Sequence, residues 1–124
     1  MPSRCKTLLA TAALLLATPA TAQQVRMLVQ SSPLAGYNYL EAPAVFHAMR
    51  AGDALSLVRE PHNAHDANAI RVDWDGHRLG YVPRSQNAAL AAALDRGEPI
   101  AARISRLQPH RNPRLRVEFE VFVD

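Results

Sequence analysis

The chain has 124 residues, one cysteine, and 14 Lys and Arg against 11 Asp and Glu, a formal net charge of +3. This length suits a single domain with one modest core. One cysteine excludes a disulfide framework, and no apolar run reaches the roughly 20 residues that cross a bilayer as a helix.

The first 22 residues have the three-part pattern of a secretory signal peptide. Arg4 and Lys6 form a positive start, Thr7 to Ala17 is an uncharged apolar stretch, and Ala20-Thr21-Ala22 is a small-residue cleavage motif. We therefore expect cleavage after Ala22 and an exported protein, periplasmic or secreted, without stable membrane insertion. A buried N-terminal helix or a membrane anchor is the alternative, but the apolar stretch is about half the length that spans a bilayer.

Cleavage would change both the net charge and the cysteine content of the protein. Removing residues 1–22 leaves 102 residues in one predicted domain, 23–124, and takes away Cys5. It also removes Arg4 and Lys6, so 12 basic residues, all of them Arg, remain against 11 acidic ones, for a net charge of +1. The net charge therefore says little about partners, and only local clusters of charge can indicate them.

Short strands dominate the predicted domain. We expect one strand at Val25 to Gln30 and another at Ala54 to Arg59, where apolar residues alternate with polar ones. A further short strand could cover Tyr37 to Tyr39, and residues 44–50 are ambiguous, with a helical turn as one interpretation. Two strand-like runs, 69–74 and 77–82, are separated only by Asp75-Gly76, which predicts a two-residue hairpin turn because both positions accept positive φ.

One helix and two strands complete the prediction. Residues 85–96 are rich in Ala and Leu and are followed by Gly97, which is typical of a helix and its C-terminal stop. Strands follow at 99–107 and 115–123. The second has a core face by alternation, formed by Leu115, Val117, Phe119, Val121 and Val123. Five to six short strands with one helix, about 85–96, predict a mainly β fold, a small OB-like or SH3-like barrel that hides its sheet edges.

One loop concentrates unusual residue types. It reads REPHNAHDANAI from Arg59 to Ile70, with GYNYLE (36–41) ahead of it and GYVPR (80–84) behind it. In order and spacing these motifs resemble the HIRAN domain family over about Leu34 to Leu107. The resemblance implies an OB-like barrel that acts as a non-enzymatic nucleic-acid-binding module and, in DNA-remodelling members, grips the free 3′ end of single-stranded DNA. Family members often occur joined to helicase, ATPase or nuclease domains, which this sequence does not indicate.

The resemblance also implies binding residues by position. Tyr37 and Tyr39 match an aromatic pair that stacks on terminal bases. Asp66 matches an acid that receives the terminal 3′-hydroxyl, His65 stands where a stacking Tyr is common, and Arg84 matches a basic position near the phosphates. The full set of candidates is Tyr37, Tyr39, Arg59, Asn63, His65, Asp66, Asn68, Tyr81 and Arg84.

Each residue type also has a purely structural explanation. Aromatic faces stack on any base for about 1–3 kcal/mol, yet strand tyrosines are often half-buried packing residues. A carboxylate can accept a sugar hydroxyl, yet Asp and Asn in loops often bond backbone amides. The basic run also has two explanations: its arginines could contact phosphates, or they could form a strand face exposed to solvent. The run consists of Arg103, Arg106, Arg111, Arg114 and Arg116.

Three residues of the loop, His62, His65 and Asp66, are types that bind zinc. Loop histidines need not converge and no cysteine accompanies them, so we expect no cofactor, with zinc as a weak alternative. No nucleophile motif or phosphate-binding loop indicates catalysis.

Three functions therefore remain open. The first is binding of a single-stranded nucleic-acid end in a groove of the loop and the aromatic residues. The second, which export favours, is an extracytoplasmic module that binds a protein or small ligand in the same groove. The weakest is a metal-dependent hydrolase built on His62, His65 and Asp66.

Overall fold

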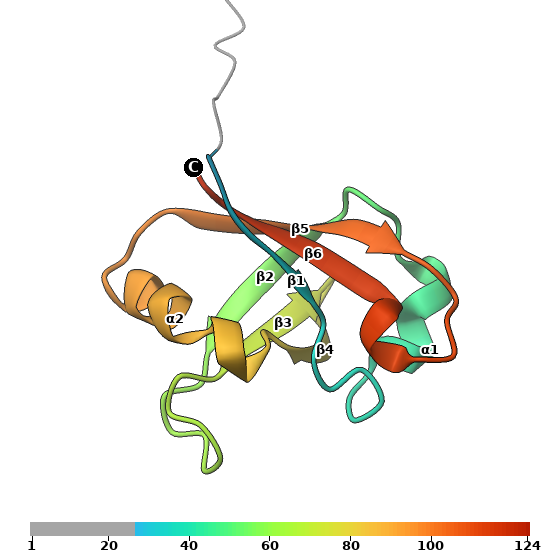
Figure 1. Cartoon of the computed structure of the whole chain (residues 1–124), viewed down its shortest axis with the longest axis horizontal. Helices are drawn as coiled ribbons and strands as arrows, with labels where there is room; N and C mark the ends of the chain where they lie inside the picture. The colour runs from blue at the N-terminus through green and yellow to red at the C-terminus, as the bar shows by residue number, and fades with distance from the viewer. Residues whose placement is uncertain (1–26) are drawn as a thin grey trace, which may run out of the picture.

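The computed structural model describes residues 27–124, so the predicted export signal and its cleavage site lie outside the described residues. The fold is mainly β, as predicted (Figure 1). The strands are β1 (Met27–Pro33), β2 (Ala54–Arg59), β3 (Ile70–Trp74), β4 (His77–Tyr81), β5 (Ile100–Leu107) and β6 (Val117–Val123). The helices are α1 (Ala42–Val45), α2 (Ala88–Asp95) and the short 3₁₀ helices η1 (Phe46–Ala48), η2 (Arg84–Gln86) and η3 (Pro113–Leu115). Over this part of the chain, no helix combines the length and apolar character needed to cross a membrane.

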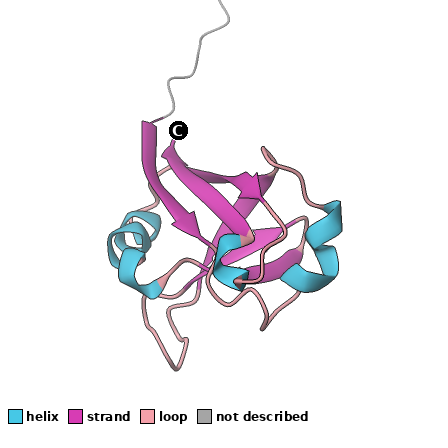
Figure 2. Ribbon diagram, turned by 45° about the vertical axis from the view of Figure 1, so that its right-hand side comes forward, coloured by secondary structure: helices cyan, strands magenta, loops and turns pink. Residues whose placement is uncertain are grey.

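The six strands form one antiparallel sheet in the order β1-β6-β5-β2-β3-β4. The sheet changes direction along β2, whose residues Ala54 and Leu55 pair with β5 while Ser56 to Arg59 pair with β3. Figure 2 shows the strands crossing one another in a curved sheet. Irregular pairing in β1, β3 and β5 adds curvature, as β-bulges do. The sheet therefore coils around its core in the OB-like manner that the sequence predicts.

The predicted barrel does not close as a continuous sheet. β1 and β4 are its two edges, and they meet through one isolated bridge just beyond β1, in which Ala35 and Tyr81 exchange two backbone hydrogen bonds of 2.9 Å. Pro33 before the bridge and Pro83 after it cannot donate backbone hydrogen bonds, so the pairing cannot extend regularly at those positions. We call this single Ala35–Tyr81 bridge the seam.

The core lies inside the coiled sheet, with α2 packed against one end (Figure 1). Val117, Phe119 and Val121 of β6 are fully buried, as their alternation predicts. Leu115 instead lies in η3 and is 48% exposed, because the chain turns at Pro113 before β6 begins. The largest fully buried side chains outside β6 are Leu34, Met49, Ile70, Val72, Leu79 and Ile104.

Local signals account for most element boundaries. Asp75 and Gly76 form the predicted hairpin turn, with φ values of 46° and 79°. The predicted helix is confirmed but shorter, because η2 and then Asn87 precede α2. The optional strand at 37–39 is wrong: these residues form a turn, with Tyr39 N–H donating to the Gly36 carbonyl at 3.0 Å.

Candidate nucleic-acid interface

A groove of about 320 Å³ opens directly beside the seam. Its polar wall comes from the β2–β3 loop and from the segment that enters α2. Its floor, around the seam, is largely apolar and is formed by Ala35, Ala69, Tyr81 and Val82. The lining residues are Ala35, Asn63, His65, Asp66, Ala69, Tyr81, Val82, Arg84 and Asn87. We call this the end groove, and it brings together five of the predicted binding residues: Asn63, His65, Asp66, Tyr81 and Arg84.

The carboxylate of Asp66 is held in a fixed position in the end groove. Its Oδ2 accepts a hydrogen bond from Asn87 Nδ2 at 2.7 Å, and its Oδ1 accepts one from the backbone N–H of Asn68 at 2.9 Å. The Asn87 hydrogen bond, then that of Asn68, and then the charges of Arg84 and Arg59 hold the pKa of Asp66 below its ordinary value. Asp66 is therefore an ionised acceptor at neutral pH, and each carboxylate oxygen keeps a lone pair for a ligand.

Asn63 and Tyr81 are fixed by a residue outside the predicted set. Glu60 Oε1 accepts hydrogen bonds from Tyr81 Oη at 2.8 Å and from Asn63 Nδ2 at 3.1 Å, and Glu60 Oε2 pairs with Arg71 at 3.1 Å. Burial raises the pKa of Glu60, but the hydrogen bonds from Asn63, Tyr81 and Arg71 outweigh it, so the net pKa is lowered. Asn63 Oδ1 in turn accepts the His65 N–H at 2.9 Å. This network of hydrogen bonds holds the loop in shape.

The two predicted cations have different surroundings. The Arg84 side chain is 78% exposed, lies 3.9 Å from Asp66 Oδ2 and donates to the His65 carbonyl at 3.0 Å, so its charge stands at the mouth of the end groove. Arg59 lies outside the groove, and its side chain is only 15% exposed. It donates to the carbonyls of Ala67 and Ala69 and forms a two-pronged pair with Asp95 of α2, at 3.0 and 3.3 Å. Arg59 thus fastens the loop to α2.

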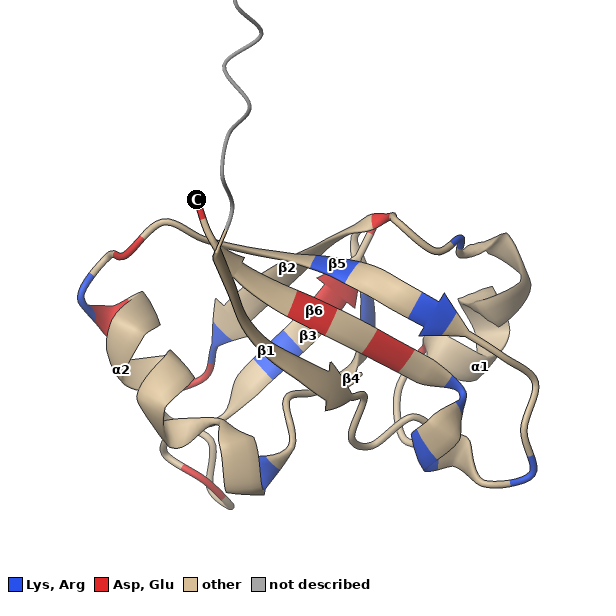
Figure 3. Ribbon diagram, turned by 45° about the horizontal axis from the view of Figure 1, so that its top comes forward, with Lys and Arg blue, Asp and Glu red and all other residues tan. Residues whose placement is uncertain are grey.

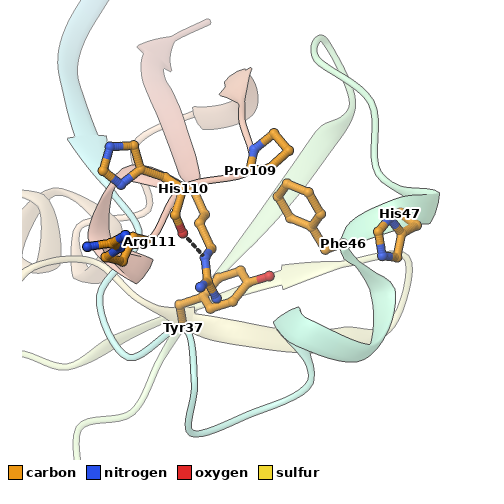
Figure 4. A pocket seen from close by; sticks show the side chains of 7 residues that line it. Tyr37, Phe46, His47, Pro109, His110 and Arg111 are labelled. Atoms are coloured by element: carbon orange, nitrogen blue, oxygen red, sulfur yellow. Dashed lines mark hydrogen bonds between the residues drawn. The ribbon is translucent and has the colours of Figure 1, made fainter.

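The predicted aromatic pair is split between two surfaces. Tyr37 is 5% exposed and packs into the core, with the Arg116 guanidinium 5.0 Å above its ring and Phe46 edge-on at 6.2 Å (Figure 4). Tyr39 is 88% exposed and lines a hollow beside the end groove, together with Arg114. Asn68 is exposed, and its recorded contact with Asp66 is through its backbone N–H.

The candidate metal ligands do not converge. His65 and Asp66 line the end groove, whereas His62 lines a separate hollow with Arg59, Glu60, Pro61 and Asn63. Within residues 27–124, no group of three His, Cys, Asp or Glu side chains is arranged to hold a metal ion.

Sequence reasoning missed Asn87, which is 3% exposed and is the strongest partner of Asp66. The only sequence signal for Asn87 is its position at the start of a helix, where Asn is usually a capping residue. In this structure its side chain makes no capping hydrogen bond and instead bonds Asp66 of the loop. Glu60 and Arg71 were missed because their contacts cross from the loop to β3.

A coiled six-stranded sheet with a preformed loop groove beside its seam defines an OB-like binding domain. The chain belongs to the HIRAN domain family, which matches it over residues 27–124. The HIRAN family is known for nucleic-acid-binding modules.

Two solved structures and one curated relative are similar to this chain. A crystal structure of a protein from Lactobacillus plantarum shares 27% sequence identity at a TM-score of 0.69, covering 79% of this chain and 94% of that one. The crystal structure of the HIRAN domain of human HLTF has the same fold, at 20% identity and a TM-score of 0.58, covering 78% of each chain. The Fanconi-associated nuclease 1 homolog of Oryza sativa subsp. japonica is 40% identical over 52 residues, which is 39% of this chain and 5% of that protein. The chain therefore matches only a small part of the nuclease.

Proposed function

We propose that the domain binds the 3′ end of single-stranded nucleic acid, with the terminal nucleotide in the end groove. The observation that carries the proposal is the Asp66 carboxylate, which is ionised, held by Asn87 and Asn68, and faces a groove with an apolar floor. A fixed carboxylate accepts a hydrogen bond from a terminal 3′-hydroxyl and repels a 3′-phosphate. It therefore reads the chemical state of the end rather than the base sequence.

The residues around Asp66 supply the rest of the recognition. Arg84 stands beside the carboxylate with an exposed guanidinium, which suits the phosphodiester that precedes the terminal sugar. The exposed ring of His65 stacks on the terminal base, and Tyr39 stacks on the preceding one. These contacts are hydrogen bonds, stacking and ion pairing, so we propose a binding module without catalytic activity of its own.

The test compares oligonucleotides that end in 3′-OH and in 3′-phosphate. Fluorescence anisotropy with a label at the 5′ end gives the Kd of each, at low and moderate salt. We expect tighter binding of the 3′-OH strand, by about tenfold, which corresponds to one charge-assisted hydrogen bond of about 1.4 kcal/mol. Asp66→Asn should abolish this preference, because a neutral amide no longer repels the phosphate.

Asp75→Asn is the matched control, because it removes one carboxylate from the hairpin turn, where Asn-Gly is equally favourable. It should leave the preference intact. Equal Kd values of the wild-type protein for the two ends would rule out the proposed reading of the 3′-hydroxyl.

A second candidate function rests on residues 1–22, whose pattern predicts export to the periplasm or outside the cell. In that case we propose that the same end groove binds an extracytoplasmic protein segment or small ligand. Cell fractionation with N-terminal sequencing of the purified protein separates the two settings. A chain beginning at Gln23 in the periplasm supports the second, and an uncleaved cytoplasmic chain contradicts it.

A further inference from the structure

A second hollow, of about 520 Å³, lies beside the Tyr37 ring (Figure 4). It is lined by Tyr37, Phe46, His47, Pro109, His110, Arg111 and Arg116. We propose that this basic hollow is a second subsite for the same strand, which binds the phosphodiester backbone upstream of the 3′ end. The inference rests on the proposed function and adds to it a strand path and a minimum ligand length.

The charge of the basic hollow has one sign. Its lining includes two arginines and two histidines and no carboxylate. The chain between β5 and β6 contains three arginines, Arg111, Arg114 and Arg116, and no Asp or Glu (Figure 3). Within residues 27–124, none of Arg111, Arg114 and Arg116 forms an ion pair with a carboxylate. Their charges are therefore available to an anionic ligand.

Arg116 is held ready for a phosphate. Its guanidinium lies over the buried Tyr37 ring, and its Nε donates to the His110 carbonyl at 2.7 Å, the bond drawn in Figure 4. One edge of the guanidinium is thereby fixed, and its two terminal amino groups remain as donors for a planar or tetrahedral oxyanion. A preformed donor loses little side-chain entropy on binding.

The loop that carries the other cations is also fixed by its own hydrogen bonds. Asn112 N–H donates to His110 Nδ1 at 2.9 Å, and Asn112 Oδ1 accepts the Arg114 N–H at 3.0 Å. Gln108 Nε2 bonds the Leu115 carbonyl at 2.9 Å. Because His110 Nδ1 is an acceptor, Nε2 carries the ring proton and is a further donor. The hollow is thus a shaped set of donors rather than a mobile basic loop.

Continuity with the end groove favours a nucleic-acid strand over a separate small anion. The hollow that contains Tyr39 and Arg114 also contains Tyr37, which it shares with the basic hollow. It contains Leu34 and Gly36 as well, the two neighbours of Ala35 in the end groove. Residues of the segment 34–39 therefore line all three hollows. Each hollow also contains an arginine, which is Arg84 in the end groove, Arg114 beside Tyr39 and Arg111 in the basic hollow. A strand leaving the end groove past Tyr39 meets the basic hollow next, where Phe46 provides an apolar wall for a base.

The experiment measures how affinity depends on strand length. Thymidine oligonucleotides of three and ten residues, both with a free 3′-OH and a 5′ label, are titrated by anisotropy at several salt concentrations. Arg111→Gln is the test variant, because the structure records no hydrogen bond of its side chain within the described residues. Arg106→Gln is the matched control: Arg106 is an exposed arginine of β5 that lines none of the three hollows.

We expect the wild-type protein to bind the ten-residue strand more tightly than the three-residue strand. Arg111→Gln should weaken the longer strand about fivefold at low salt and reduce its salt slope by about 0.7, the value for one phosphate contact on a single strand. The three-residue strand should bind Arg111→Gln and wild type equally. Arg106→Gln should change neither Kd by more than about twofold.

The two proposals fail in different ways. Equal affinity for both lengths, or equal weakening by Arg111→Gln and Arg106→Gln, overturns the second subsite and leaves the end groove intact. If the wild-type protein binds the 3′-OH and 3′-phosphate strands equally, but Arg111→Gln still weakens binding of the ten-residue strand, only the end-reading function is overturned. Absence of binding to either strand overturns both.

Discussion

The side-chain amide of Asn87 donates a 2.7 Å hydrogen bond to Asp66 Oδ2 across 21 residues of sequence. Asn87 is almost completely buried at the start of α2, whereas Asp66 belongs to the β2–β3 loop and reaches the end groove. The helix start thus fixes the direction of the carboxylate and stabilises its charge. Asn87 and Asp66 are therefore structurally coupled although they are far apart in the sequence.

Replacement of Asn87 by Ala should raise the pKa of Asp66, because it removes the largest cause of the lowered value. Carboxyl-carbon chemical shifts, followed by NMR against pH, measure it directly. Because the pKa of Asp66 is lower in the folded protein than in the unfolded chain, ionised Asp66 stabilises the fold. In the wild-type protein Asp66 contributes stability above its unfolded pKa, about 3.9, and this contribution disappears as pH falls through the folded value.

Asn87→Ala should therefore lose stability at neutral pH and approach the wild-type protein in acid. Asn68→Ala is the control, since Asn68 supplies a backbone N–H that the substitution retains. An unchanged Asp66 titration in Asn87→Ala would contradict the role assigned to the amide.

Tyr81→Phe tests the network behind the groove. Burial first, and then the hydrogen bond to Glu60, raise the pKa of Tyr81. A raised pKa means that Tyr81 contributes stability below its unfolded value, about 10, and that this stability disappears as pH rises through the folded value. Urea unfolding from neutral to strongly alkaline pH should show a loss of about 1 kcal/mol for Tyr81→Phe at neutral pH and a flatter alkaline limb. An alkaline limb as steep as that of the wild-type protein would count against this assignment.

Arg59→Gln separates support of the loop from direct contact with nucleic acid. Because the largely buried Arg59 bonds two loop carbonyls and Asp95, its replacement should lower the free energy of unfolding by about 1–3 kcal/mol. The urea midpoint measures this, with Arg106→Gln as the exposed-arginine control. If Arg59→Gln weakened oligonucleotide binding at unchanged stability, Arg59 would instead contact the ligand.

Gly80→Ala should break the seam. A Cβ on Gly80 would collide with the Ala35 carbonyl oxygen and press on the Leu34 side chain, both of which are held in place by the bridge and the core. Such a clash costs about 1–3 kcal/mol or more, and thermal unfolding by circular dichroism measures it. Gly76→Asn is the control, because nothing lies near that position and Asn accepts its positive φ. Equal melting temperatures for Gly80→Ala and wild type would contradict the close approach at the seam.

Local chemistry explains which parts of the fold the sequence could predict. The limits of β2 and the turn at Asp75 and Gly76 agree with prediction, because neighbouring residues alone determine alternation and positive φ. The different environments of Tyr37 and Tyr39 could not be read in this way. They are two residues apart, but Gly36 starts a turn that sends one ring into the core and leaves the other in solvent. The partner of Asp66 was equally hidden, since only the folded chain brings Asn87 to the loop.

The seam has a consequence for how binding and folding are linked. The end groove takes Ala35 from one border of the sheet and Tyr81 from the other, so a molecule seated in it touches both borders. Such a molecule acts as a removable cross-link on a sheet that is otherwise joined there by one pair of hydrogen bonds, and it stabilises the closed form by mass action. The backbone amides of Ala35 and Tyr81 are thus built-in reporters, and their hydrogen exchange should slow in proportion to occupancy, whatever the chemical nature of the occupant.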